Sequence, residues 1–498
     1  MSSSYRASVY NHAIPHGDQW LVFNGVSSAL ILLDQPTFLR LEPYLFAERD
    51  SIVSRPHFRP VLNRGAAFDL EGIHNPELRS TLEQLIDAQY LVEENLDELD
   101  SLRQRYRIRQ NEDPLLVTVV PTMDCNLGCY YCYEEKYPSR MSLDTCDRIY
   151  DYIVHDLSTR NQKRMHLGWF GGEPMLNRDA IDYLSAKLWP YCKTANIRYS
   201  VSMVSNGTVW PSDPQECRDF VLRNKIGSIQ FSFDGLAKNH NNRRHYINGN
   251  NRHEVSSFDA LSRTVEALRG IVKQYLRLNL DKGNKNDVQE LIEYFRVRGW
   301  FDSGSKIYPY LAALSPYTDA CTSVNQTAVD PKEFDEMENG FRDSLGRYID
   351  LSDFVYANYP RALPLNCSAV AKHSVIFGPD GEMYKCPHDL GVKSMTHGHL
   401  DQTVNSSASL FQILNNRSNS AERSAAHDYP SYDPFANSTC SQCRYLPNCL
   451  GGCPKEKFDD RQYYLGSICE TWETIFEPMV RNFADSLQRT QAGAVAML

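Results

Sequence analysis

Long apolar runs, an excess of basic residues and a hydrophobic N-terminal segment are all missing from this chain of 498 residues. No apolar stretch approaches the ~18 residues of a membrane-spanning helix. The opening Met-Ser-Ser-Ser-Tyr-Arg does not resemble a signal peptide. The formal net charge of −10 argues against a nucleic-acid-binding surface, because such domains are basic. We therefore expect a cytoplasmic protein without a membrane or nucleic-acid partner.

Cysteine is absent from residues 1–124, whereas the rest of the chain holds all 14. In a reducing compartment, clustered cysteines indicate metal sites rather than disulfides, which would be the alternative in a secreted chain. The length predicts two to four domains, because single hydrophobic cores stop growing beyond ~250–300 residues.

Residues 1–112 predict a separate small domain. Leu21 to Gly25 and Ala29 to Leu33 form strands around an Asn-Gly turn, and Glu77 to Tyr90 has helical apolar spacing before a short strand that ends at Glu94. Asn95 to Gln110 is a charged amphipathic stretch, interpreted as a solvated linker helix. The order of these elements resembles winged-helix modules that bind leader peptides. A packing subdomain without a ligand is the alternative.

Residues 113–350 alternate short apolar runs with helical stretches, which is typical of an α/β fold with a parallel sheet. Six candidate strands favour a partial, TIM-like (β/α)6 barrel over a closed eight-stranded one. They are Leu115 to Val120, Met165 to Phe170, Tyr199 to Val204, Ser228 to Phe233, Leu276 to Leu280 and Lys306 to Leu311.

The loop after the first of these strands carries Cys125, Cys129 and Cys132. A [4Fe-4S] cluster takes four thiolates, so three at the spacing C-x3-C-x2-C hold three irons and leave the fourth open to another ligand. Three ordinary buried cysteines are the alternative. This spacing, with the aromatic Tyr131 before the third cysteine, resembles the signature of radical S-adenosylmethionine (SAM) enzymes. The resemblance implies that the cofactor's methionine chelates the open iron and that the reduced cluster cleaves the sulfonium to a 5′-deoxyadenosyl radical.

Further polar motifs follow the next strands. Gly171, Gly172 and Glu173 resemble the family's Gly-Gly-Glu-Pro motif, which holds the cofactor's amino group. The resemblance also implies that Tyr131 contacts the cofactor. Three more side chains resemble family segments that face the cofactor's ribose or carboxylate, namely Ser205, Asn206 and Ser232. Each motif alone is also an ordinary turn.

A His-x3-Arg pattern formed by His240 and Arg244 resembles that of sulfatase-maturase-like members, and Arg244 would pair with the cofactor carboxylate. Arg243 is an alternative for this role, as is a surface arginine without a role. By the same resemblance Asn279 lies near the cofactor's methionine.

Seven further cysteines follow residue 360. A structural zinc site would need four ligands, and this region offers more. The order C-x18-C, C-x2-C-x5-C-x3-C, then C, with Gly381 before the second, resembles the SPASM domain, which carries two auxiliary [4Fe-4S] clusters. The resemblance assigns auxiliary cluster I to Cys367, Cys386 and Cys453, and auxiliary cluster II to Cys440, Cys443, Cys449 and Cys469.

Auxiliary cluster I lacks one cysteine by this assignment. Either His373 or His388 supplies the fourth ligand, or an iron stays open for substrate. The four cysteines outside the motifs are interpreted as packing residues: Cys146, Cys192, Cys217 and Cys321.

These resemblances predict a barrel over residues 113–350, a SPASM domain over 360–480 and a tail over 481–498. They imply SAM and three [4Fe-4S] clusters as cofactors, a flavodoxin or ferredoxin-type electron donor, and a peptide or protein substrate, bound in part by residues 1–112. The predicted function is an oxidoreductase that matures a ribosomally made peptide by a thioether or carbon-carbon crosslink. A sulfatase-type maturase that forms formylglycine and a nonenzymatic iron-sulfur electron carrier are the alternatives, and no catalytic acid or base is assigned.

Overall fold

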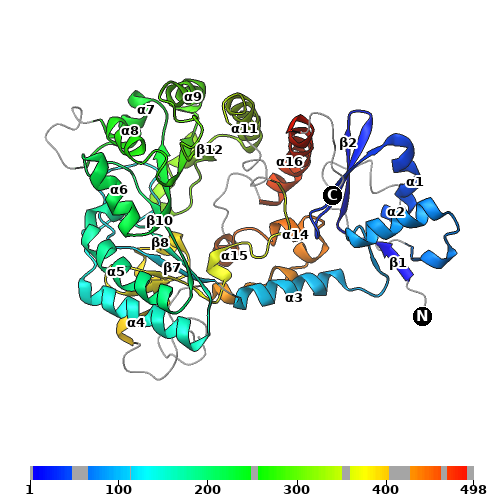
Figure 1. The fold of residues 1–498 in the computed structure, drawn as a ribbon, viewed down its shortest axis with the longest axis horizontal. Coiled ribbons are helices and arrows are strands. Elements are labelled where there is room, and N and C mark those ends of the chain that lie inside the picture. Colours follow the sequence, from blue (N-terminus) through cyan, green and yellow to red (C-terminus); the bar gives the residue numbers. More distant parts are fainter. Residues whose placement is uncertain are drawn as a thin grey trace.

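The structure, a computed structural model, describes residues 4–46, 66–112, 114–247, 256–349, 359–402, 427–460 and 468–490. Figure 1 shows the barrel at one end of the molecule and the N-terminal part at the other, with C-terminal segments between them. None of the helices in the described ranges is both long enough and apolar enough to cross a bilayer.

Six parallel strands form the barrel sheet, and each neighbours the next in chain order. They are β7 (Leu115–Val119), β8 (Arg164–Trp169), β9 (Arg198–Val204), β10 (Ile226–Phe233), β11 (Lys273–Leu280) and β12 (Ile307–Ala313). All six predicted strands are confirmed with small boundary shifts, and with them the partial (β/α)6 barrel. Short apolar runs separated by amphipathic helices favour a parallel sheet with its strands in chain order.

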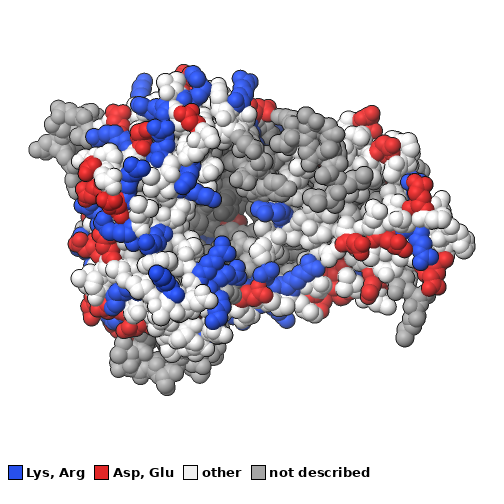
Figure 2. All heavy atoms as spheres, viewed as in Figure 1, with Lys and Arg blue, Asp and Glu red and all other residues white. Residues whose placement is uncertain are grey.

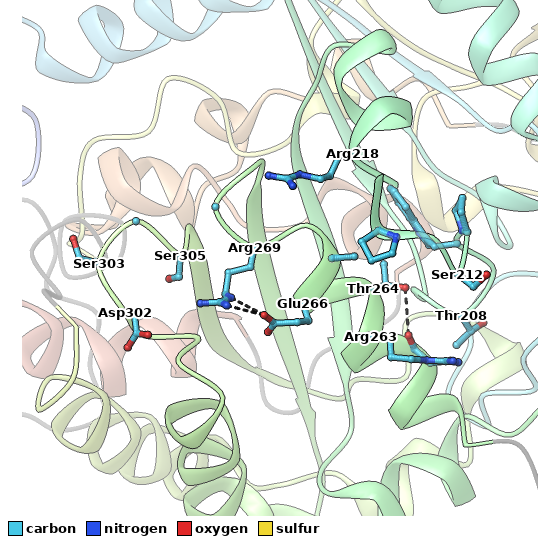
Figure 3. A pocket seen from close by; sticks show the side chains of 17 residues that line it. Thr208, Ser212, Arg218, Arg263, Thr264, Glu266, Arg269, Asp302, Ser303 and Ser305 are labelled. Carbon is cyan, nitrogen blue, oxygen red and sulfur yellow. Dashed lines mark hydrogen bonds and ion pairs between the residues drawn. The ribbon is translucent and has the colours of Figure 1, made fainter. Parts of the chain in front are cut away.

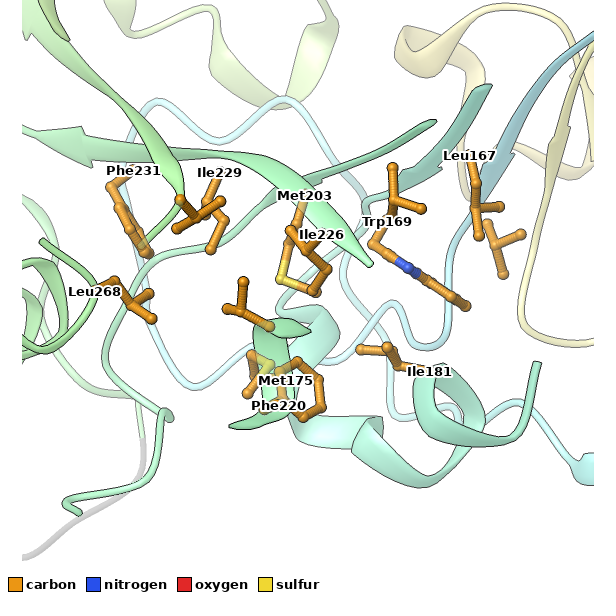
Figure 4. Close-up of a cluster of buried hydrophobic side chains, with 14 of the residues drawn as sticks. Leu167, Trp169, Met175, Ile181, Met203, Phe220, Ile226, Ile229, Phe231 and Leu268 are labelled. Atoms are coloured by element: carbon orange, nitrogen blue, oxygen red, sulfur yellow. The ribbon is translucent and has the colours of Figure 1, made fainter. Parts of the chain in front are cut away.

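Helices cover the outer face of this sheet (Figure 1). They are α4 (Leu143–Thr159), α5 (Arg178–Thr194), α6 (Pro214–Arg223), α7 (Ala237–Arg243), α8 (Ser257–Ala267), α9 (Val288–Val297) and α11 (Pro331–Leu345). The short α10 (Val324–Thr327) instead packs near the tyrosines that follow Cys129. Figure 4 shows Trp169 and Met203 of the strands packed toward Ile181 of α5 and Phe220 of α6. Burial of these side chains holds the helices on the sheet.

Alternate strand residues point to the inner face of the barrel, and many of these are polar. On β10, Ile229, Phe231 and Phe233 are buried, whereas Gln230 and Ser232 between them are only partly buried. A polar inner face differs from the apolar packing on the outer face, so the barrel interior is suited to a polar ligand.

Three C-terminal strands continue the same sheet beyond β7. The strand β13 (Ser374–Phe377) pairs in parallel with β7, and β14 (Glu382–Tyr384) and β15 (Gly398–His399) follow in antiparallel order. Backbone bonds flank the pairing, from Leu116 N to His373 O at 2.7 Å and from Val120 N to Phe377 O at 2.9 Å. The cysteine-rich segment is therefore joined to the barrel through its sheet.

The N-terminal part contains two three-stranded antiparallel sheets. One is formed by β1 (Ser4–Ala7), β5 (Phe68–Asp69) and β6 (Leu91–Glu93), and the other by β2 (Asn11–His16), β3 (Gln19–Asn24) and β4 (Leu30–Asp34). Two helices complete it, α1 (Gln35–Leu45) and α2 (Pro76–Asp87). The predicted strands around Asn24, the helix and the strand after it are confirmed.

The helix α3 (Glu98–Asn111) is not the solvated linker that its charge predicts. Leu102 and Tyr106 are buried in a cluster with Phe435 and Leu446 of the C-terminal segment. Gln110 Nε2 donates to the carbonyl oxygens of Val370 at 3.3 Å and Pro430 at 3.1 Å. The expectation was wrong because one face of the helix, formed by Glu98, Leu102, Tyr106 and Gln110, is buried against partners from distant sequence.

The last described helix, α16 (Ile468–Thr490), also reaches the N-terminal part. Phe476 and Val480 share a buried cluster with Ile14, Leu21 and Phe23 of β2 and β3. The shorter α14 (Leu446–Cys449) and α15 (Pro454–Asp459) lie between these elements and the barrel (Figure 1). The N-terminal and C-terminal segments therefore share hydrophobic cores.

Candidate active site

The first cysteine loop leaves the carboxyl end of β7. Cys125 is buried, and Cys129 and Cys132 are partly exposed. Cys132 N donates to Cys129 O at 3.2 Å in a turn, and Lys136 Nζ donates to Leu127 O at 2.6 Å. Burial opposes the charge of Lys136, but the nearby thiols of Cys132, Cys125 and Cys129 raise its pKa overall. The cysteine motif does not predict a role for this lysine. The sign of such a role in the sequence is a cation that closely follows the last cysteine.

The donors of this loop suit an iron-sulfur cluster. Within the described part of the chain, no group of three or more His, Cys, Asp or Glu side chains is arranged to hold a single metal ion. A cluster binds its thiolates at separate irons, and its negative charge matches the ammonium of Lys136. The loop can therefore supply Cys125, Cys129 and Cys132 to a cluster.

The glycine pair after β8 lies against this loop. Gly171 has φ +116°, a conformation that favours glycine, and a Cβ on Gly172 would lie 2.2 Å from Asp124 O. Gly172 N donates to Thr122 O at 3.2 Å, and Glu173 N donates to Asp124 O at 2.9 Å. The two loops are thus joined backbone to backbone, which only glycine permits at this separation.

Glu173 is fully buried, and protein donors occupy both of its oxygens. Oε1 accepts from Met175 N at 3.1 Å and from Ser205 Oγ at 2.9 Å, and Oε2 accepts from Asn206 N at 2.6 Å. Burial raises the pKa of Glu173 to about 7, although the hydrogen bonds from these donors act to lower it. The carboxyl links the loops after β8 and β9, because the Ser205 hydroxyl and the Asn206 backbone both donate to it.

Asn206 connects the third loop to the first cysteine. Its Nδ2 lies 3.8 Å from Cys125 Sγ and 2.8 Å from Asn126 Oδ1, and Asn126 Nδ2 donates to Thr208 Oγ1 at 2.8 Å. An amide donor beside a thiolate ligand stabilises its negative charge. Asn206 is therefore placed to position the cysteine loop.

Tyr131, Arg244 and Asn279 meet in one hydrogen-bonded group. Arg244 Nη1 donates to Tyr131 Oη at 2.5 Å, and Asn279 Nδ2 lies 3.2 Å from Tyr131 Oη and 3.2 Å from Asp234 Oδ1. Arg243 instead donates to Asp281 Oδ1 at 2.8 Å. Burial opposes the charge of Arg244, but Cys129, Tyr131 and Asp234 together raise its pKa well above the usual value. The geometry favours Arg244 over Arg243 at the cysteine loop.

Two further residues of the sequence motifs, His240 and Ser232, differ in their placement. His240 is fully buried, and its Nδ1 accepts from Asp234 N at 3.3 Å, so it supports the turn after β10. Ser232 is half-buried on the inner face of β10, in register with Arg277 of β11. Ser232 therefore faces the barrel interior.

The C-terminal cysteines form two sets. The four assigned to auxiliary cluster II line one cavity together with Tyr445 and Trp472: Cys440, Cys443, Cys449 and Cys469. The thiols of the other set influence one another, since Cys367 and Cys453 both contribute to the raised pKa of Cys386, to which burial contributes most. The folded chain thus separates these seven cysteines into the groups of four and three that the resemblance implies.

The two histidines near the group of three lie in different places. His373 is hydrogen-bonded to Arg160 at the start of β13. The His388 ring stacks on Tyr317, with centroids 4.7 Å apart, and meets the edge of Tyr133 at 4.8 Å. His388 therefore lies between the C-terminal cysteines and the barrel, whereas His373 lies at the outer helix.

Tyr133 connects the two regions. It directly follows Cys132 in the chain, and its phenol is also close enough to Cys386 for that thiol to affect its pKa, which burial raises most. The barrel opening between the first loop and the nearer C-terminal cysteines is thus lined by aromatic rings. The cysteines outside the motifs are confirmed as packing residues, since all four are fully buried: Cys146, Cys192, Cys217 and Cys321.

A separate pocket of about 590 Å³ lies on the outer face of the barrel, between α6 and α8. Figure 3 shows Arg218 and Arg263 on its walls and Arg269 paired with Glu266. Its lining residues come mainly from α6, α8 and the loops after β9 and before β12. Thr208 in the first of these loops also bonds Asn126 of the cysteine loop.

Comparison with known proteins identifies the barrel. Residues 119–295 match the family model of the radical SAM superfamily. The chain contains a radical SAM domain. This domain uses SAM and a [4Fe-4S] cluster, and the chain is an enzyme.

Relatives of this radical SAM enzyme are distant in sequence. The radical SAM cyclopropyl synthase TigE of Paramaledivibacter caminithermalis is 20% identical over 215 residues, which cover 39% of this chain and 42% of TigE. The chain thus matches less than half the length of this curated relative. The structure of anSMEcpe with bound AdoMet is similar with a TM-score of 0.56 at 16% identity, over 75% of this chain and 100% of that one. A second anSMEcpe structure, with AdoMet and the Cp18Cys peptide, has a TM-score of 0.52 at 16% identity, over 75% and 99%. At such identity the likeness concerns the fold.

Proposed function

We propose that this radical SAM enzyme matures a ribosomally made peptide or protein by an oxidative modification, such as a thioether or carbon-carbon crosslink. The likeness in fold to peptide-bound anSMEcpe supports a peptide substrate. Bound SAM and its cluster would supply a radical able to remove hydrogen from an unactivated C–H bond.

One observation carries the oxidative part of the proposal. The C-terminal cysteines gather as a group of four in one cavity and a group of three near Tyr133. Each group suits an auxiliary [4Fe-4S] cluster, and clusters beside a substrate can accept an electron. Net oxidation is therefore favoured over a reaction that returns the hydrogen.

The residues around the opening have distinct roles in this proposal. Cys125, Cys129 and Cys132 hold the first cluster, and the Gly171–Gly172 backbone, Asn279 and Arg244 hold SAM. Glu173 and Ser205 act through these loops as positioning residues, since their polar atoms are bonded within the protein. The rings of Tyr133, Tyr317 and His388 exclude water from the substrate.

The test uses the full chain, loaded with iron and sulfide under anaerobic conditions and supplied with SAM, a reductant and a candidate precursor peptide encoded beside the gene. Mass spectrometry should show peptide that has lost two hydrogens, with 5′-deoxyadenosine formed in proportion. Formylglycine in a Cys-x-Pro-x-Arg peptide would instead establish the sulfatase-type reaction. Failure to form 5′-deoxyadenosine at all would overturn the proposal.

The N-terminal part is proposed to hold a segment of the same substrate. A variant that lacks residues 1–112 would also expose the buried face of α16, so a surface variant is the better test. Arg40 and Arg79 lie on exposed faces of α1 and α2, and their joint replacement by Glu should raise KM for a precursor peptide without changing SAM cleavage. Unchanged KM would refute this role for these helices.

A further inference from the structure

Arg277 is a cation on the inner face of the barrel, and it forms no ion pair with a carboxylate of the described residues. It lies on β11 between the buried Leu276 and Leu278, so its side chain points to the opposite, interior side of the strand. After burial, the described groups that affect its pKa most are the phenols of four tyrosines: Tyr310, Tyr317, Tyr133 and Tyr131. Phenols are neutral near pH 7, so they leave the guanidinium charge uncompensated.

The other arginines of this region differ from Arg277. Arg243 is paired with Asp281 at 2.8 Å and Asp234 at 3.5 Å, and Arg244 lies 3.9 Å from Asp234. Buried charges in proteins are normally paired in this way, because an isolated charge is costly to desolvate. A partly buried arginine without a carboxylate among the described residues is therefore available for a negative ligand.

The donors of Arg277 are only partly used. Its Nε donates to Asn279 Oδ1 at 2.8 Å. The neighbouring Tyr310 hydroxyl, which feels the charge of Arg277, donates to Gln230 Oε1 at 2.8 Å. Of the five N–H donors on an arginine, one is thus engaged, and the others can form the two parallel bonds that a carboxylate accepts.

The position of Arg277 lies within the proposed reaction space. Through Asn279 it is one residue away from Tyr131 of the first cysteine loop. On the other side its charge reaches His388, where it contributes to the lowered pKa after burial and Lys455. In Figure 2, Lys and Arg side chains border the hollow between the barrel and the N-terminal part. An anionic ligand would therefore approach along a favourable surface.

From these observations we infer that Arg277 binds a carboxylate of the peptide substrate, from an Asp or Glu side chain or the C-terminus, and so fixes the residue to be modified. This inference rests on the proposed peptide substrate. A carboxylate of SAM is the other source of the same chemistry, and the experiment separates the two.

The test uses the full chain, anaerobic and cluster-loaded, with four synthetic probes. Acetyl-Gly-Gly-Asp-Gly-Gly-amide is compared with its Asn counterpart, and acetyl-pentaglycine acid with its amide, by saturation-transfer NMR in the presence of SAM. We expect at least one acid to bind roughly tenfold more tightly than its neutral counterpart, because charge-assisted bidentate bonds contribute about this much. The acid that shows the preference identifies the carboxylate.

Three variants accompany the wild type. Arg277→Gln should abolish the preference for the acid, Arg277→Lys should retain part of it, and Arg263→Gln removes an equal charge from the outer pocket and should leave it intact. If Arg277→Gln does not fold, Arg277→Lys still tests the inference, because lysine keeps the positive charge but lacks the paired N–H donors of the guanidinium.

The outcomes are distinct. No acid preference in the wild type, or a preference that survives in Arg277→Gln, overturns the inference. Loss of SAM affinity in Arg277→Gln without any change in peptide binding assigns the carboxylate to SAM and also overturns it. Formation of 5′-deoxyadenosine without peptide is measured in parallel, and its absence in the wild type refutes the proposed function while the binding result still decides the role of Arg277.

Discussion

Substitution of Gly172 by Ala tests how closely the loops after β7 and β8 must approach. The new Cβ would lie 2.2 Å from Asp124 O and 2.7 Å from Met123 O, whereas ordinary contact begins at 3.4 Å. These neighbours are backbone atoms that cannot rotate away, so the loops must separate by about 1 Å. The separation weakens the bonds from Gly172 N to Thr122 O and from Glu173 N to Asp124 O. At ~1 kcal/mol for each bond, the free energy of unfolding should fall by roughly 2 kcal/mol.

The functional loss should exceed the loss of stability. A displacement of about 1 Å in a positioning loop can lower a rate by roughly 100-fold, so SAM cleavage should fall by about that factor. The assay combines thermal unfolding of the cluster-loaded protein with the rate of 5′-deoxyadenosine formation. Gly340→Ala is the matched control, because a Cβ there meets nothing within 4 Å on α11. If the Gly172 variant melts and cleaves SAM like the wild type, the close approach has no functional role.

Three further predictions concern other contacts. Glu98→Gln should lower the free energy of unfolding by ~3–5 kcal/mol in denaturant titrations, because it leaves Arg6 buried and unpaired 2.8 Å away, and an effect below about 1 kcal/mol would contradict this. Asn206→Ala should make the midpoint potential of the first cluster more negative in an EPR-monitored redox titration, since it removes the amide beside Cys125, and an unchanged potential would show that the contact is not formed in the loaded enzyme. Cys469→Ala should reduce the iron content by about one cluster while SAM cleavage persists, and wild-type iron content would exclude this cysteine as a ligand.

The barrel was predictable because its signals are local. Each strand is a short apolar run, and the motif residues follow the strand ends, where parallel sheets gather their loops. These features depend on neighbouring residues and on chain order, which a sequence displays directly. The division of the C-terminal cysteines into two groups was instead implied by the resemblance to the SPASM domain.

Contacts between distant segments were not predictable in the same way. The four residues of β13 carry no sign that they pair with β7, and the charged face of α3 conceals the apolar face that meets Phe435. The saturation of Glu173 by its neighbours and the lack of a carboxylate beside Arg277 are properties of packing. Such properties require the coordinates of all the partners.

The pairing of β13 with β7 also limits how this enzyme can be rearranged. The strand β7, which leads to the first cysteine loop, and β14, which leads to Cys386, lie on either side of β13 in one sheet, so ladders of backbone hydrogen bonds fix their separation. Electron transfer between sites on these two strands would take place over a constant distance, whatever substrate lies between them. A chimera that exchanges the C-terminal segment with that of a relative would therefore have to be joined inside a continuous sheet. Its success should depend on the register at Val117 and Val375 rather than on linker length.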